Sequence, residues 1–180
     1  PYAMNTSACV AYSIEYLLSL YNEQEDLLIL PSDQLIENID IFINSIQSGQ
    51  QLSQDSYHVV FGIQPTYPAT GYGYIELGNM INQGMFHVKQ FKEKPDLQRA
   101  QSFLESGNFF WNCGIFLWKL KTIQESFQQF YPEGMKIIDQ IKQHHYKIEA
   151  FFKIRSLYRK LPKLPIDISI MENVEKRAVI

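Results

Sequence analysis

The stretch Leu27-Leu28-Ile29-Leu30-Pro31-Ser32-Asp33-Gln34 decides the fold class. Its first four residues form a short, continuous apolar run, which is typical of a buried strand in a parallel sheet. Pro31 then stops the strand because it has no backbone N–H to donate. Helical spacing of apolar residues precedes this run from Val10 to Tyr21 and follows it from Leu35 to Ile46. A helix, a buried strand and a second helix predict an α/β fold.

Asp33 comes directly after this predicted strand. In α/β sheets, ligands bind at the carboxyl ends of the strands. A carboxylate in that place can hold a divalent cation that bridges phosphates. Asp33 or Ser32 can equally cap the helix that follows. The spacing alone leaves the metal-ligand and helix-cap interpretations open.

A charged cluster ends a second predicted strand. The alternating run from Phe86 to Phe91 predicts a half-buried strand, and Pro95 prevents it from continuing. Between them, the Glu93 carboxylate can accept hydrogen bonds from vicinal hydroxyls, and the Lys94 ammonium can hold a phosphate. This pair suits a sugar phosphate. A solvated charged cluster at a strand end would explain the same residues.

Glycine and asparagine interrupt two further apolar or aromatic segments. In Thr70-Gly71-Tyr72-Gly73-Tyr74 the glycines lack a Cβ, so a ligand can approach the backbone closely. Asn112 lies within the apolar run 109–118. A buried amide left without a partner costs roughly 1–3 kcal/mol, so Asn112 must bond either to a backbone group or to a ligand hydroxyl.

Composition limits the classes of function. The 180 residues are 46% hydrophobic with a net charge of −3, so no basic field favours a nucleic-acid partner. The longest apolar runs are too short to span a membrane. Cys9 and Cys113 are the two cysteines, and each has apolar neighbours. We expect two reduced thiols in a cytoplasmic protein rather than a disulfide.

The rest of the chain predicts further elements of an α/β fold. Asn5-Thr6-Ser7 signals the start of a helix, because these side chains can accept from the first free amides. His144 and His145 lack the spacing of a metal site and are interpreted as a surface pair. The remaining predictions are helices at 97–105, 122–130, 134–143, 148–159 and 169–173, strands at 57–63 and 176–180, and a hairpin turn at 78–84.

Taken together, these segments resemble the sugar-1-phosphate nucleotidyltransferases, most closely the mannose-1-phosphate guanylyltransferases. Asn5-Thr6 matches the end of an Arg-Asn-Thr signature. Six blocks in the right order cover nearly the whole chain. They are Leu30-Pro31-Ser32-Asp33, Phe61-Gly62-Ile63-Gln64-Pro65-Thr66, Thr70-Gly71-Tyr72-Gly73-Tyr74-Ile75, Phe91-Lys92-Glu93-Lys94-Pro95-Asp96, Trp111-Asn112-Cys113-Gly114-Ile115-Phe116 and Pro165-Ile166-Asp167-Ile168-Ser169-Ile170-Met171-Glu172.

The resemblance implies a Rossmann-like α/β fold with a mixed central sheet. It implies transfer of GMP from GTP to mannose 1-phosphate with Mg²⁺, giving GDP-mannose for polysaccharide biosynthesis. It assigns roles to eight residues of this sequence. Asp33 is implied as a metal ligand, Gly73 and Glu93 as contacts of the sugar, Lys94 as the contact of its phosphate, Asn112 and Asp167 as further sugar or phosphate contacts, and Asn5 and Thr6 as neighbours of the nucleotide.

The sequence also departs from the family pattern. Met4 stands where the signature has Arg, and Gln34 stands where the family usually has His. We expect residues 1–180 to be the central and C-terminal part of one nucleotidyltransferase domain. The family's nucleotide-gripping loop would precede Pro1, and its second metal-ligating Asp would follow Ile180. This stretch alone is then not expected to catalyse.

Two alternatives remain open at this stage. One is an inactive regulatory relative that binds sugar nucleotide. Another is a bifunctional parent with mannose-6-phosphate isomerase activity in a separate cupin domain. The sequence also leaves open whether the protein forms a homo-oligomer.

Overall fold

The computed structural model describes residues 2–144 and 150–180. They form two compact units, which are described separately. The sheet unit comprises residues 26–119 and 175–180, and the helical unit comprises residues 1–25 and 120–174. The described helices fall short of the length and apolar character that a membrane crossing requires.

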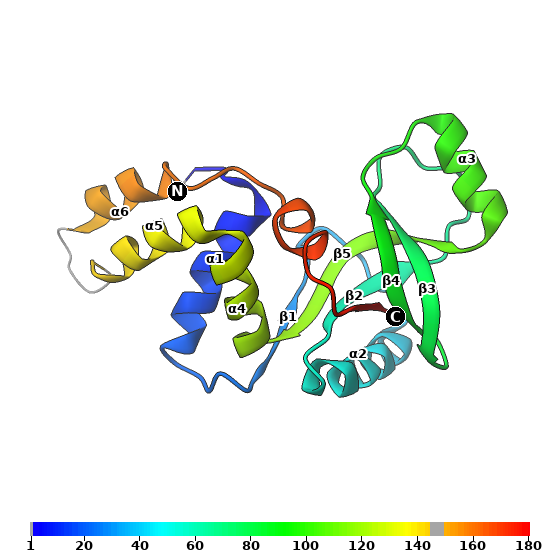
Figure 1. Cartoon of the computed structure of the whole chain (residues 1–180), viewed down its shortest axis with the longest axis horizontal. Coiled ribbons are helices and arrows are strands. Elements are labelled where there is room, and N and C mark those ends of the chain that lie inside the picture. Colours follow the sequence, from blue (N-terminus) through cyan, green and yellow to red (C-terminus); the bar gives the residue numbers. More distant parts are fainter. Residues whose placement is uncertain (1, 145–149) are drawn as a thin grey trace. The chain divides into compact units, whose positions relative to one another are not determined.

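The sheet unit is built on one mixed sheet (Figure 1). Its described strands run in the order β1-β5-β2-β6-β4-β3, and β3 also pairs with β5, so five strands close on themselves. β2 and β6 are parallel, whereas the other described pairings are antiparallel. The expected mixed α/β architecture is confirmed. The strands are β1 Asp26–Ile29, β2 His58–Ile63, β3 Tyr74–Asn82, β4 Met85–Lys92, β5 Phe109–Lys119 and β6 Arg177–Val179.

The prediction that Leu27–Leu30 forms a buried parallel strand is wrong in direction and in burial. β1 is antiparallel to β5, with Leu28 opposite Leu117, and its four residues are half-buried. A continuous apolar run indicates that both faces are at least partly covered, but it does not reveal the direction of the partner strand. The partner, β5, is distant in the sequence and could not be deduced from the run itself.

A bulge interrupts β5 beside β2. Val60 lies opposite Phe116 and Gly62 lies opposite Asn112, so β5 has two extra residues between these pairs. Gly114, within the bulge, has a φ of +70°, a left-handed conformation that glycine adopts without a Cβ penalty. The bulge therefore changes the direction of β5 directly after Asn112.

Helix α2, Ile39–Gln54, begins four residues later than predicted. Its N-cap is Asn38, whose side-chain oxygen accepts from the Ile41 amide at 3.0 Å. Asn38 thus provides the cap that the alternative interpretation assigned to Asp33 or Ser32. That interpretation is wrong, because the chain runs five residues beyond Asp33 before the helix starts.

The helix predicted at 97–105 in the sheet unit is confirmed. Helix α3, Leu97–Ser106, is capped by Asp96, whose oxygen accepts from the Arg99 amide at 2.8 Å. It ends at Gly107, which is left-handed with a φ of 69°. The predicted hairpin joins β3 to β4, but its turn is tighter than residues 78–84 because Asn82 already pairs with Met85.

The helical unit contains α1 Asn5–Leu18, α4 Leu120–Phe130, α5 Pro132–Lys142, α6 Phe151–Tyr158 and η2, a single π-helical turn at Asp167–Met171. Its helices pack on one another, α1 against α4 and α5, and α5 against α6. The predicted helix 148–159 corresponds to α6, and its first residues lie outside the described ones. His145 also lies outside them, and His144 is half-buried.

The predicted capping at the start of α1 is only partly right. The Asn5 side chain accepts from the adjacent Thr6 amide at 2.8 Å. Thr6 and Ser7 point to another part of the helical unit. The Thr6 hydroxyl accepts from the Ile166 amide, and the Ser7 hydroxyl bonds to that of Ser169 at 2.7 Å. Tertiary partners thus replace the local caps.

We expect His58 to make the sheet unit sensitive to acid. Burial lowers the pKa of His58 from 6.5 to about 4. The unfolded chain binds a proton more readily, so this stability is fully present above pH 6.5 and falls as the pH drops towards 4. At pH 5 the loss is about 2 kcal/mol relative to pH 8. Urea unfolding at several pH values measures it. The difference in the free energy of unfolding between pH 8 and pH 5 should be smaller in His58→Leu. An unchanged pH dependence in that variant would exclude His58 as the cause.

Candidate functional site

Three of the predicted site residues meet at one place in the sheet unit. A Cβ added to Gly73 would lie 3.1 Å from Oε2 of Glu93 and 3.6 Å from Cβ of Asn112. The backbone amide of Asn112 donates to the Gly73 carbonyl at 2.8 Å. The segment before β3, the end of β4 and the middle of β5 are therefore adjacent, as expected of a site built from these three blocks.

Lys94 is the fourth member of this cluster. Its ammonium lies 3.4 Å from Oε1 of Glu93, and the Lys94 and Glu93 side chains are 65% and 47% exposed. Such exposure leaves both head groups accessible to a ligand. Lys94 has a φ of 38°, which is uncommon outside glycine and carries some backbone strain. The turn brings its ammonium back to Glu93, although adjacent strand residues normally point to opposite faces.

Asn112 has a backbone partner, as one of its two interpretations required. Its side-chain oxygen accepts from the Gly114 amide at 3.0 Å, across the bulge. This bond fixes the orientation of the side chain. The Asn112 amide nitrogen lies 3.8 Å from the Cβ position of Gly73. The backbone interaction therefore coexists with a position beside Glu93.

Asp33 lies in the exposed segment between β1 and α2. Among the described residues, its side chain makes no hydrogen bond or ion pair. The segment itself contacts the β5 bulge, because Gln34 Nε2 donates to the Cys113 carbonyl at 2.6 Å. Pro31 Cγ is 3.7 Å from where a Cβ on Gly114 would lie. The segment that carries Asp33 thus contacts the bulge beside Asn112.

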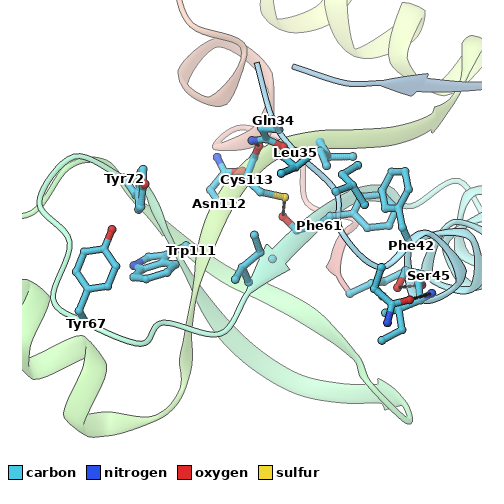
Figure 2. Close-up of a pocket in the computed structure, with 17 residues that line it drawn as sticks. Gln34, Leu35, Phe42, Ser45, Phe61, Tyr67, Tyr72, Trp111, Asn112 and Cys113 are labelled. Atoms are coloured by element: carbon cyan, nitrogen blue, oxygen red, sulfur yellow. Dashed lines mark hydrogen bonds between the residues drawn. The ribbon is translucent and has the colours of Figure 1, made fainter. Parts of the chain in front are cut away.

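A pocket of about 580 Å³ opens next to Asn112 in the sheet unit (Figure 2). Its walls come from α2, the segment before α2, the end of β2 and the β5 bulge. They are mainly apolar, with Leu35, Phe42 and Phe61 among them. Cys113 also lines the pocket, where burial raises the pKa of its thiol and Sγ donates to the Phe61 carbonyl at 2.8 Å. Both cysteines are free thiols, as expected.

An aromatic cluster at one end of this pocket was not among the predicted site residues. The rings of Tyr67 and Tyr72 lie 4.8 and 5.3 Å from that of Trp111, both edge-on (Figure 2). A side-chain hydrogen bond with Tyr72 raises the pKa of Tyr67. The buried Trp111 Nε1 has no hydrogen-bond partner among the described residues. The density of tyrosines near Gly73 was the available sequence signal, but it did not show which rings would meet.

The remaining predicted residues, Asn5, Thr6 and Asp167, belong to the helical unit. Thr6 bonds to the residue that precedes Asp167, because its hydroxyl accepts from the amide of Ile166 at 2.8 Å. Asn5 begins α1 with a φ of 68° and is exposed, as is Thr6. Asp167 is half-buried at the start of η2. Within this unit the structure thus brings together two segments that are about 160 residues apart.

The family model described as "Nucleotidyl transferase" matches residues 2–157. The chain belongs to the nucleotidyl transferase family. The resemblance inferred from the six sequence blocks is thereby confirmed. A mannose-1-phosphate guanylyltransferase of Sinorhizobium fredii is 33% identical over 100% of this chain. A mannose-1-phosphate guanylyltransferase 2 of Escherichia coli O157:H7 is 33% identical over 99% of it. This nucleotidyl transferase chain spans 35% and 39% of the lengths of these two relatives.

Two solved structures are also similar to this nucleotidyl transferase. One is described as a mannose-1-phosphate geranyltransferase from Thermus thermophilus. It has a TM-score of 0.83 at 26% identity over 100% of this chain and 50% of its own. The other is described as a mannose-6-phosphate isomerase from Helicobacter pylori. It has a TM-score of 0.84 at 27% identity over 99% of this chain and 69% of its own. Both similarities support the mixed α/β fold.

Proposed function

We propose that this nucleotidyl transferase takes part in transferring GMP from GTP to mannose 1-phosphate, giving GDP-mannose and pyrophosphate. The observation that carries the proposal is the meeting of Gly73, Glu93, Lys94 and Asn112 at one place. These residues come from three blocks that resemble the guanylyltransferases. The relatives named mannose-1-phosphate guanylyltransferase support the choice of sugar and base.

The cluster has the groups that a sugar phosphate needs. Glu93 and the Asn112 amide can bond to sugar hydroxyls beside Gly73, where the absence of a Cβ leaves room. A side chain at Gly73 would approach the Glu93 carboxylate at 3.1 Å and compete for that space. Lys94, as a compact point charge, suits the phosphate. On this proposal Lys94 exchanges its contact with Glu93 for one with the incoming dianion.

The reaction needs alignment and charge neutralisation more than proton transfer. A phosphate oxygen of mannose 1-phosphate attacks the α-phosphorus of GTP and forms a new P–O bond. The bond from that phosphorus to the bridging oxygen breaks, and pyrophosphate leaves with the electron pair. The attacking oxygen is already anionic, so no general base is required. We propose that Lys94 holds the acceptor phosphate in line for this attack.

We propose Mg²⁺ as the cation and Asp33 as one of its ligands. Among the described residues, no group of three or more His, Cys, Asp or Glu side chains could hold a metal. One exposed carboxylate still fits Mg²⁺, which is commonly bound by one or two carboxylates together with substrate phosphates. A cation bound there would neutralise charge on the triphosphate.

Asp33→Asn tests the role of this carboxylate. Losing the charge should raise the Mg²⁺ concentration for half-maximal rate about tenfold, equivalent to about 1.4 kcal/mol. Thermal stability should stay unchanged, because Asn38 and not Asp33 caps α2. Steady-state rates over a Mg²⁺ series, with a melting curve of each variant, measure both. A lowered melting temperature with normal Mg²⁺ dependence would assign Asp33 a structural role instead.

For Asn5, Thr6 and Asp167 we keep the roles that the resemblance implies, the first two near the nucleotide and Asp167 as a sugar or phosphate contact. The hydrogen bond from Ile166 to Thr6 brings the segments of Thr6 and Asp167 together, which supports a ligand shared by the two residues.

We also propose that the chain is part of one Rossmann-like nucleotidyltransferase domain. Its sheet departs from an open Rossmann sheet in one respect, because β3 also pairs with β5. The free thiols favour a cytoplasmic location.

Pyrophosphate release by the full-length protein tests the proposal. With GTP, Mg²⁺ and mannose 1-phosphate, we expect release that depends on all three. A clear preference for another nucleotide or sugar phosphate would refute the substrate assignment. Binding of GDP-mannose without turnover would instead identify an inactive regulatory relative.

A second candidate activity is mannose-6-phosphate isomerisation, which the name of the Helicobacter pylori structure suggests for the longer protein. We assign none of it to the described residues, since they contain no group of three metal-ligating side chains. Conversion of mannose 6-phosphate to fructose 6-phosphate by the full-length protein would establish it. The guanylyl transfer proposed above does not depend on that result.

A further inference from the structure

One hydrogen bond connects the segment that carries Asp33 to the rest of the sheet unit. Residues 31–37 lie between β1 and α2, outside any helix or strand. Gln34 Nε2 donates to the Cys113 carbonyl at 2.6 Å. Among the described residues, this is the one hydrogen bond that a side chain of residues 31–37 makes. The Pro31 ring adds an apolar contact near Gly114.

The acceptor of this bond belongs to the bulge that orients Asn112. Across that bulge, the Asn112 side chain accepts from the Gly114 amide at 3.0 Å. The Asn112 backbone amide donates to the Gly73 carbonyl at 2.8 Å. A continuous series of hydrogen bonds therefore runs from Gln34 through the bulge to Gly73, which lies beside Glu93.

We propose that Gln34 is a positioning residue that couples the Asp33 segment to the sugar-phosphate cluster. This inference rests on the proposed function. With the carboxamide bonded, Asp33 is held at a fixed place relative to Asn112. Without it, residues 31–37 would lose their side-chain hydrogen bond to the bulge, and we expect Asp33 to sample more positions. Binding of mannose 1-phosphate would then fix the side chains of the cluster without fixing the position of Asp33.

The geometry explains why the side chain must be a donor. The Cys113 carbonyl can only accept, so the side chain at position 34 must offer a hydrogen-bond donor such as an N–H. Gln34→Leu keeps a side chain of similar size but removes the donor. Gln34→His places a ring N–H in the same region. Gln98→Leu, on the exposed surface of α3, makes the same chemical change away from the bulge and is the matched control.

Sub-second amide hydrogen exchange of the full-length protein, with mannose 1-phosphate as the probe, tests the coupling. In the wild type we expect the sugar phosphate to slow exchange in residues 31–38 about threefold or more. Gln34→Leu should abolish this slowing and should speed exchange in residues 31–38 and 112–115 without ligand. Gln34→His should retain at least half of the slowing, and Gln98→Leu should behave as the wild type.

Kinetics supply a second readout that a purely structural role would not change. Gln34→Leu should raise the KM for mannose 1-phosphate and the half-saturating Mg²⁺ concentration together, each about fivefold, with an unchanged melting temperature. Equal slowing by ligand in Gln34→Leu and wild type would overturn the inference. So would an absence of slowing in a wild type that binds the sugar phosphate. If the wild type does not bind mannose 1-phosphate at all, the proposed function fails. The role of Gln34 is tested separately without ligand, because unchanged exchange of residues 31–38 in Gln34→Leu would refute it.

Discussion

On the function proposed above, replacing Lys94 with alanine in the full-length protein will lower kcat/KM for mannose 1-phosphate by a factor on the order of 10 to 100. A hydrogen bond to a charged group contributes roughly 1.5–3 kcal/mol, which corresponds to that range. The Lys94 ammonium lies 3.4 Å from Glu93 and is mostly exposed, so it can reach an incoming phosphate. Steady-state kinetics at saturating GTP and Mg²⁺ measure the effect.

Three comparisons make the Lys94 test specific. Lys89→Ala removes an ammonium that pairs with Glu76 on the neighbouring strand, and it should leave kcat/KM unchanged. Lys94→Arg should recover only part of the loss, because a planar fork cannot take the place of a compact ammonium in this turn. The KM for GTP should change little in Lys94→Ala. Unchanged use of mannose 1-phosphate by Lys94→Ala would exclude this residue from the site.

Sequence reasoning succeeded where a local signal fixes a local structure. The helix predicted at 97–105 is α3, Leu97–Ser106. Its two ends depend on residues within one turn of the helix, because Asp96 caps its start and Gly107 ends it with a positive φ. The charged end of β4 was likewise readable, since Pro95 marks where a strand stops. Asn38 shows the limit of such signals, because Ser32 and Asp33 offered equally good caps and the chain used a later one.

The parts of the fold that sequence reasoning missed depend on distant partners. β1 and β5 are about 90 residues apart, and the sequence of neither strand indicates that the two pair in the antiparallel direction. The pairing of β3 with β5 closes the sheet in the same nonlocal way. The β5 bulge was visible only as Asn112 and Gly114 in an apolar run. Because the sequence did not reveal the bulge, it could not predict the hydrogen bond from Gln34 to Cys113 either.

Replacing Gly134 with alanine will destabilise the helical unit by about 3 kcal/mol. Gly134 lies in the first turn of α5, where helix propensity alone would favour alanine by roughly 0.5–1 kcal/mol. A Cβ there would overlap the ring of Tyr131. Tyr131 is 3% exposed; its ring packs edge-on to Phe127 at 5.7 Å, and its hydroxyl donates to the Pro162 carbonyl at 2.6 Å. Overpacking of a buried ring and the loss of its hydrogen bond outweigh the propensity.

A drop of roughly 6–12 °C in melting temperature should accompany this change in a chain of this size. Gly71→Ala is the matched control, because nothing lies within 4 Å of a Cβ at that position and the melting temperature should stay the same. In a Tyr131→Leu background the cost of Gly134→Ala should largely disappear, since the clashing ring is gone. Additive losses in the double variant would show that the clash with Tyr131 is not the cause. Stabilisation by Gly134→Ala would mean that helix propensity, rather than the packing of Tyr131, decides the stability at this position.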